Sequence, residues 1–259
     1  MKKQIALLAL WIGTTCLLAQ PSKPQIADLH FHWEGKASLD KLIEESAAQG
    51  VKLGITGEGG ATWGLSGDQS LTAYLAKLDG KPVYRGLQVY SRDWPQRYSK
   101  EVLAKLDYVT ADALLFPDRG GRSIALWNPN VSFPDPEDFM ERYMEYNLRI
   151  LAEPINIWTN PTYLPESLQA QYDKLWTPAR MRKLIDAAVK NQVVIEINSK
   201  YNIPSIAFLK LARQQGAKFA FGSNRHDDEA GNLDYCLKMY QELGLNAENM
   251  YAPAGPRVR

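Results

Sequence analysis

Short apolar runs alternate with amphipathic segments along most of the chain. The run IADLHFH (26–32) precedes SLDKLIEESAAQG (38–50), where Leu39 and Leu42 recur at helical spacing and Gly50 can end a helix. The same succession recurs at 51–59 and 70–80, 82–91 and 99–106, 107–116 and 135–150, 150–158 and 177–192, 193–200 and 204–216, and 218–226 and 232–244. This pattern predicts about seven strand–helix units in tandem, which is typical of a parallel sheet with helical crossovers.

Both an open doubly wound sheet and a closed barrel fit such a succession. Polar and charged residues gather at the carboxyl ends of nearly all the runs, where (β/α) barrels carry their active sites. An open sheet usually has a glycine-rich phosphate loop after its first strand, and HFHWEGKAS is not such a loop. The pattern therefore favours a barrel.

The first nineteen residues have the layout of a secretory signal peptide. Lys2 and Lys3 precede an apolar stretch over 5–19, which is shorter than the roughly 20 residues of a membrane-spanning helix. We predict cleavage after Ala19, export of a 20–259 chain to the periplasm or medium, and no stable membrane insertion. A retained anchor and lipidation of Cys16 remain open alternatives.

Composition excludes some partners. Hydrophobic residues make up 45% and charged residues 23%, as in an ordinary soluble domain. Lys and Arg number 30 against 29 for Asp and Glu, so no strong field attracts nucleic acid or an anionic membrane. We expect no nucleic-acid partner. Cleavage would leave Cys236 as the one cysteine, which rules out an intrachain disulfide.

The chain has three histidines, and two of them stand together at His30 and His32. Residues two apart on a strand point to the same face. His226 ends the last run, and closure of a barrel makes the last strand a neighbour of the first. We therefore expect the three imidazoles to meet at one cavity, where they would suit a transition-metal ion.

These runs resemble the PHP (polymerase and histidinol phosphatase) superfamily over about residues 26–250. Its motifs match, in order, DLHFH, GITGEG, YRGLQV, LDYVTADALLF, ILAEP, VVIEINS and GAKFAFGSNRH. The resemblance implies a distorted TIM-like (β/α)7 barrel over 20–259. It also implies two or three Zn, Mn or Fe ions and, usually, phosphoester hydrolysis.

The sequence departs from the family at several metal ligands. The family's H-x-H ion also uses a Glu and an Asp, and Gln88 and Asn224 stand at those positions. Restoring a glutamate at position 88 is therefore expected to tighten metal binding. A second family ion uses histidines where this chain has Leu114 and Glu153, although Asp112 on the same strand face can substitute.

The third family site uses two histidines. This chain has Glu58 at the first of these positions and His226 at the second, so the site is also incomplete. The resemblance thus implies fewer divalent ions (Zn, Mn or Fe) than usual. His30, His32 and His226 would bind an ion with Glu58 or Glu153, and the free carboxylate would be the general base. The predicted metal ligands are His30, His32, Glu58, Gln88, Asp112, Glu153, Asn224 and His226.

Aromatic and basic residues also follow the runs. Trp33, Trp63, Trp94, Trp127 and Trp158 follow the first five, where they can either bind a ring or pack on neighbouring units. Arginines near the same ends can bind an anion. The predicted substrate-binding residues are Trp33, Trp63, Arg92, Arg119 and Arg122, and the predicted catalytic residues are Glu58, Glu153 and Arg225.

The sequence thus indicates an exported metal-dependent hydrolase of a small anionic or sugar-like molecule, with a phosphoester as the expected substrate bond. Amide or lactone hydrolysis stays open, because amidohydrolase barrels begin with the same H-x-H. A catalytically degenerate barrel that only binds its ligand is the other alternative, and Gln88, Asn224 and Leu114 favour it.

Overall fold

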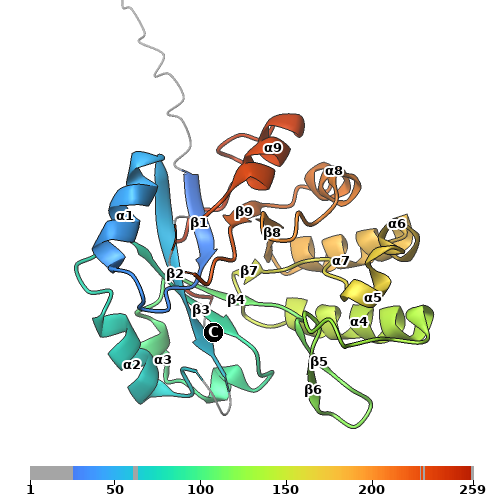
Figure 1. Ribbon diagram of the computed structural model, residues 1–259, viewed down its shortest axis with the longest axis horizontal. Helices are drawn as coiled ribbons and strands as arrows, with labels where there is room; N and C mark the ends of the chain where they lie inside the picture. Colours follow the sequence, from blue (N-terminus) through green and yellow to red (C-terminus); the bar gives the residue numbers. More distant parts are fainter. Residues whose placement is uncertain (1–25, 61–63, 228, 230, 258–259) are drawn as a thin grey trace, which may run out of the picture.

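Parallel strands pair edge to edge and close into a barrel (Figure 1). This computed structural model describes residues 26–60, 64–227, 229 and 231–257. In barrel order the strands are β1 (Ile26–Phe31), β2 (Val51–Gly59), β3 (Tyr84–Val89), β4 (Tyr108–Ala111), β7 (Ile157–Trp158), β8 (Val194–Asn198) and β9 (Phe219–Gly222). The predicted seven-stranded, TIM-like barrel is therefore confirmed. The predicted signal peptide and Trp63 lie outside the described residues.

The seam between β1 and β9 closes the barrel. Asp28 pairs with Phe221 in parallel register, and the amide of Asn224 donates to the carbonyl of His30 at 2.7 Å. The buried carboxylate of Asp28 also accepts hydrogen bonds from the amide, at 3.0 Å, and the hydroxyl of Ser223. The two ends of the barrel sequence are therefore neighbours, as the sequence predicts.

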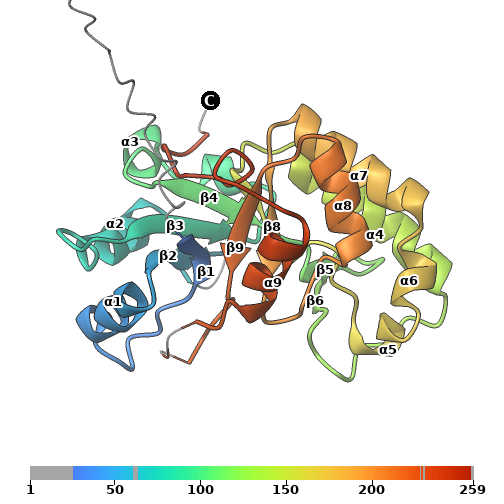
Figure 2. The ribbon, with the colours of Figure 1, turned by 90° about the horizontal axis from the view of Figure 1, so that it is seen from above.

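Helices surround the strands. They are α1 (Leu39–Ala48), α2 (Asp68–Ala76), η1 (Trp94–Gln96), α3 (Lys100–Leu103), α4 (Pro136–Leu151), α5 (Glu166–Gln169), α6 (Tyr172–Leu175), α7 (Pro178–Lys190), α8 (Ile206–Gln214) and α9 (Asp234–Glu242). Figure 2 shows α4, α7 and α8 packed side by side. None of these described helices is both long and apolar enough to cross a membrane.

The run 107–116 forms two elements instead of one strand. β4 ends at Ala111, because the buried carboxylate of Asp112 accepts a hydrogen bond from the amide of Leu114 at 3.0 Å and turns the chain. β5 (Leu115–Pro117) then pairs with β6 (Ser123–Ala125) as an antiparallel hairpin outside the barrel.

The run 150–158 also differs from its prediction. Ile150 and Leu151 are fully buried and continue the apolar face of α4, so the helix includes them. Only Ile157–Trp158 forms the strand β7. Glu153 therefore precedes its strand rather than ending it. The short helices α5 and α6, which follow β7, were not predicted.

Two layers of side chains fill the barrel interior. An apolar cluster occupies the lower layer and contains Leu29, Tyr108, Ile157, Val194 and Ala220. Further along the strands, Thr110 follows Tyr108 and Glu196 follows Val194 by two residues, and both are buried. The interior thus becomes polar toward the carboxyl ends of the strands, where the site lies.

Candidate metal site at the carboxyl ends of the strands

The three histidines converge at the upper end of the barrel. The ring centroids of His30 and His32 lie 5.1 Å apart, and the rings of His32 and His226 stack at 4.2 Å. His32 directly follows β1, and His226 follows β9. Pairing of these two strands brings the imidazoles together, as the sequence predicts.

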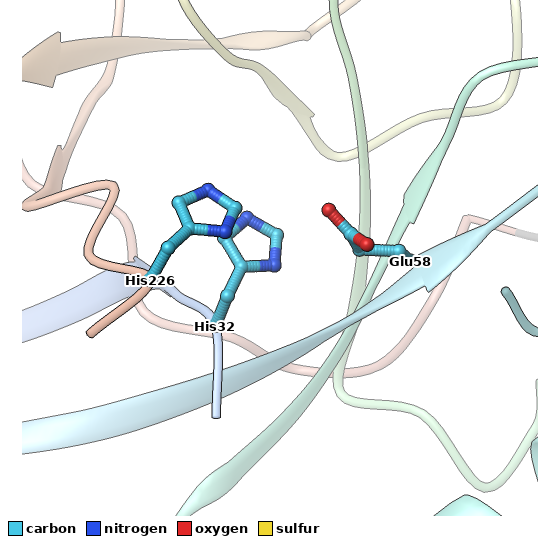
Figure 3. Close-up of side chains that lie close together, drawn as sticks. All are labelled: His32, Glu58 and His226. Carbon is cyan, nitrogen blue, oxygen red and sulfur yellow. The ribbon is translucent and has the colours of Figure 1, made fainter. Parts of the chain in front are cut away.

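His32, Glu58 and His226 form a group that can hold a metal ion (Figure 3). Each offers one ligand atom, and these atoms all lie within 4.8 Å of one another. Glu58 comes from β2, which pairs with β1 on the side opposite β9. Three adjacent strands therefore supply two imidazoles and a carboxylate, a ligand set that suits Zn, Mn or Fe.

The imidazole of His32 provides a test of whether an ion fits. Both of its ring nitrogens are buried without a hydrogen-bond partner. Burial, followed by the nearby imidazoles of His30 and His226, holds its pKa well below the usual value. A buried polar atom without a partner costs about 1–3 kcal/mol. A divalent ion would satisfy a nitrogen of this neutral ring, so the group fits a metal.

The other two members of the group are His226, whose ring is neutral, and Glu58, whose carboxylate is oriented by a hydrogen bond. Burial and then the charge of Lys200 lower the pKa of His226 to about 4, so its ring is neutral at neutral pH. Burial raises the pKa of Glu58. The hydroxyl of Tyr90 donates to a carboxylate oxygen of Glu58 at 3.3 Å and orients it. In metal sites, hydrogen bonds of this kind fix the orientation of the ligating side chains.

His30 is engaged elsewhere. Its Nδ1 lies 2.6 Å from a carboxylate oxygen of Glu196, and its Nε2 lies 3.2 Å from the side-chain oxygen of Gln88. Burial lowers the pKa of His30, but the charge and hydrogen bond of Glu196 outweigh burial and raise it overall. Both ring nitrogens face oxygen atoms, to which the protonated ring donates. The structure does not bring His30 and Gln88, both predicted as ligands, into the group: the nitrogens of His30 face Glu196 and Gln88, and the side-chain amide of Gln88 donates to Asp112.

Asp112 belongs to the same buried network. Its carboxylate accepts hydrogen bonds from the side-chain amides of Gln88 at 2.7 Å and Asn160 at 2.6 Å. Asn160 in turn accepts from the side-chain amide of Asn224 at 3.1 Å. Asn224 also lies 3.1 Å from Nε2 of His226, through its side-chain oxygen. Asp112 and Asn224 thus support the group through hydrogen bonds and are not members of it.

Glu153, predicted as a ligand or a base, is not brought to the metal-ligand group. Its carboxylate accepts from Arg92 at 3.1 Å and from the indole nitrogen of Trp94 at 2.8 Å. It lines a separate cavity of about 210 Å³ that also includes Asn191 and Arg257. The error comes from the strand assignment, since Glu153 precedes β7. Arg92 bonds to Glu153 and to the carbonyl of Val89, so it is also withdrawn from the site.

The other described residues predicted to bind substrate are Trp33, Arg119 and Arg122. None of them lines either of the two cavities next to His226. Arg119 pairs with Asp138, and Arg122 pairs with Asp118 at 2.8 Å, both beside the β5–β6 hairpin. The indole of Trp33 donates to the carbonyl of Ala37 at 2.9 Å.

Arg225, the predicted catalytic arginine, forms ion pairs with Asp227 and Glu229, both at 2.7 Å. It lines an adjoining cavity of about 540 Å³. Trp94 and Trp158 are core residues.

A cavity of about 530 Å³ opens next to the metal-ligand group. Its walls include Glu58 and His226 of the group, together with Lys200, Tyr201, Leu115 and Trp127. Lys200 is not among the site residues predicted from the sequence, although its place at the end of a predicted strand is a signal. Lys200 makes no ion pair with any described residue and is exposed at the cavity. It is therefore available to an anionic ligand.

Gln88→Glu is expected to lower stability rather than to tighten metal binding. The new carboxylate would lie where the Gln88 amide now donates to Asp112, and two buried carboxylates would then face each other. We expect the free energy of unfolding to fall by about 2–3 kcal/mol in urea titrations. Gln241→Glu, at an exposed position of α9, is the matched control and should change little. Tighter metal binding in Gln88→Glu would contradict this arrangement.

No protein-family model and no curated protein matches the sequence. Among solved structures, the chain is similar to the catalytic domain of mannanase from Streptomyces sp. SirexAA-E, with 16% identity and a TM-score of 0.43, over 91% of this chain and 77% of that one. It is also similar to HpcH/HpaI aldolase from Desulfitobacterium hafniense DCB-2, with 13% identity and a TM-score of 0.38, over 86% of this chain and 91% of that one. At these scores and identities, neither similarity bears on activity.

Proposed function

We propose that this protein is an exported, metal-dependent phosphoester hydrolase and a divergent member of the PHP superfamily. The observation that carries the proposal is the unpartnered buried imidazole of His32, which stands with Glu58 and His226 in one ligand group. This geometry supports a single divalent ion, fewer than the family pattern implies. When bound there, such an ion supplies a Lewis acid and lowers the pKa of water.

The residues of the chain have separate tasks in this proposal. Tyr90 holds Glu58 in place, and Asn224 holds His226. Lys200 supplies the positive charge that binds the phosphoryl oxygens, because the predicted arginines Arg119 and Arg122 are held in ion pairs. The buried network around His30 joins the barrel interior to the cavity, because its members Gln88 and Asp112 line the cavity.

The proposal is tested with the metal-depleted chain, to which Mn²⁺ or Zn²⁺ is added before assay on a panel of phosphomonoesters and diesters. Hydrolysis that depends on the ion is the expected result. Lys200→Met should lower kcat/KM about tenfold, because one charged hydrogen bond to the substrate is lost. Arg122→Met removes an exposed cation that pairs with Asp118 and serves as the matched control. Absence of both metal binding and hydrolysis would refute the proposal.

A ligand-binding barrel without turnover is the second candidate. The bonds from His30 to Gln88 and Glu196 favour it, because they close off positions where the PHP resemblance implies an ion. Ion and phosphate binding without hydrolysis of any panel member would decide for this candidate. Amides and lactones in the same panel would reveal amidohydrolase-type activity.

A further inference from the structure

The cavity beside the metal-ligand group is lined by two kinds of segment. Glu58, Lys200 and His226 are ionisable and lie in or just after the barrel strands β2, β8 and β9. Leu114, Leu115 and Trp127 are apolar and lie in or beside the β5–β6 hairpin. A ligand that contacts both kinds of segment needs a polar part and an apolar part.

Trp127 is the large hydrophobic side chain that stands out as exposed in the described part of the chain, with 48% of its surface accessible. Its backbone neighbours are nevertheless fixed. The amide of Leu126 donates to the carbonyl of Leu114 at 2.9 Å, and the amide of Asn128 donates to the carbonyl of Ala125 at 3.0 Å. An indole that is exposed but held on a rigid support is prepared to stack on a ligand without a large loss of entropy.

The β5–β6 hairpin, which ends two residues before Trp127, is anchored to α4 by an aromatic cluster. Phe116 of β5 is buried, and its ring lies 5.5 Å from that of Phe139 and 5.7 Å from that of Tyr143, both on α4. The hairpin is thus packed on α4. Trp127 and Leu115 consequently form a fixed wall of the cavity.

We propose that the substrate is an aryl phosphoester whose ring stacks on Trp127 while Lys200 binds its phosphoryl group. This inference rests on the proposed function and names its substrate class. A sugar ring fits less well, because Leu114, Leu115 and Trp127 give hydroxyls that lie beside the hairpin few hydrogen-bond partners. A flat aromatic ring needs none.

The inference is tested with two phosphonates that share an anionic head, phenylphosphonate and methylphosphonate. Their dissociation constants are measured by calorimetry on the full chain loaded with Mn²⁺. We expect phenylphosphonate to bind about tenfold more tightly, which is typical of one stacked ring. Trp127→Ala should remove this preference and leave the affinity for methylphosphonate within about twofold.

Two control variants sharpen the result. Trp127→Phe keeps a ring and should retain most of the preference, whereas Trp33→Ala removes an indole bonded to Ala37 and should leave the preference intact. Equal binding of the two phosphonates in the unmodified chain would overturn the substrate class while the proposed function stands. A preference that survives Trp127→Ala would also overturn it. Failure of both phosphonates to bind would overturn the inference together with the anion site of the proposed function.

Discussion

Replacing His32 by alanine is expected to weaken the binding of Mn²⁺ or Zn²⁺ at least about 100-fold. Loss of a residue that merely orients a ligand costs about 10–100-fold, and His32 is itself a member of the ligand group. Its ring nitrogens are buried and bond to no other side chain, so the substitution breaks no side-chain network of the fold. Metal titration by calorimetry measures the affinity directly.

Stability offers an independent measure of the same effect. An ion at about 100 times its dissociation constant should stabilise the unmodified chain by about 2.7 kcal/mol, and His32→Ala should lose this gain. Glu153→Gln is the control, because Glu153 is bonded to Arg92 and Trp94 outside the group. If Glu153→Gln weakened metal binding as much as His32→Ala, the assignment of the group to His32, Glu58 and His226 would fail.

Glu196→Gln is expected to lower the free energy of unfolding by about 3 kcal/mol. The carboxylate of Glu196 is 1% exposed and lies 2.6 Å from Nδ1 of His30, which is equally buried. Removing one partner of a buried ion pair leaves the other charge uncompensated, which costs about 3–5 kcal/mol. Urea unfolding at pH 6 measures the difference. Glu153→Gln, in a more accessible pair with Arg92, should cost less.

The same pair predicts a dependence on pH. The pKa of His30 is raised above the value of 6.5 that applies to an unfolded chain. The folded protein therefore holds this proton more tightly, and its stabilising effect is complete below pH 6.5. The effect is lost as the pH rises through the folded pKa. The difference between the unmodified chain and Glu196→Gln should thus shrink at alkaline pH, and a constant difference would contradict an ionised pair.

Local patterns in the sequence predict most of the barrel. The run 51–59 coincides with β2, and the amphipathic segment 135–150 nearly coincides with α4. The convergence of His32 and His226 follows from barrel closure alone, since first and last strands must then pair. Glu58 could be selected because it stands at the end of a strand next to β1.

Other features depend on contacts that no local pattern contains. Ile150 and Leu151 fit a strand or a helix, and only the packing of α4 decides between them. Reading them as the start of a strand puts Glu153 at the site, whereas in the structure Glu153 precedes β7. The partner of His30 is Glu196, which lies 166 positions away, so the pairing that removes His30 from the ligands is set by tertiary structure. The three-residue strands β5 and β6 are too short to show a period.

The seam between β1 and β9 has a consequence for synthesis of the protein. Asp28 and Ser223, which join the two strands, are 195 positions apart, and His226 comes just after β9. A nascent chain can pair β1 with β2 early, but it completes neither the hydrogen-bonded seam nor the ligand group before translation has passed residue 226. Chains that end before His226 should thus lack one member of the ligand group, and sequestration of a metal ion would mark the chains that have finished folding.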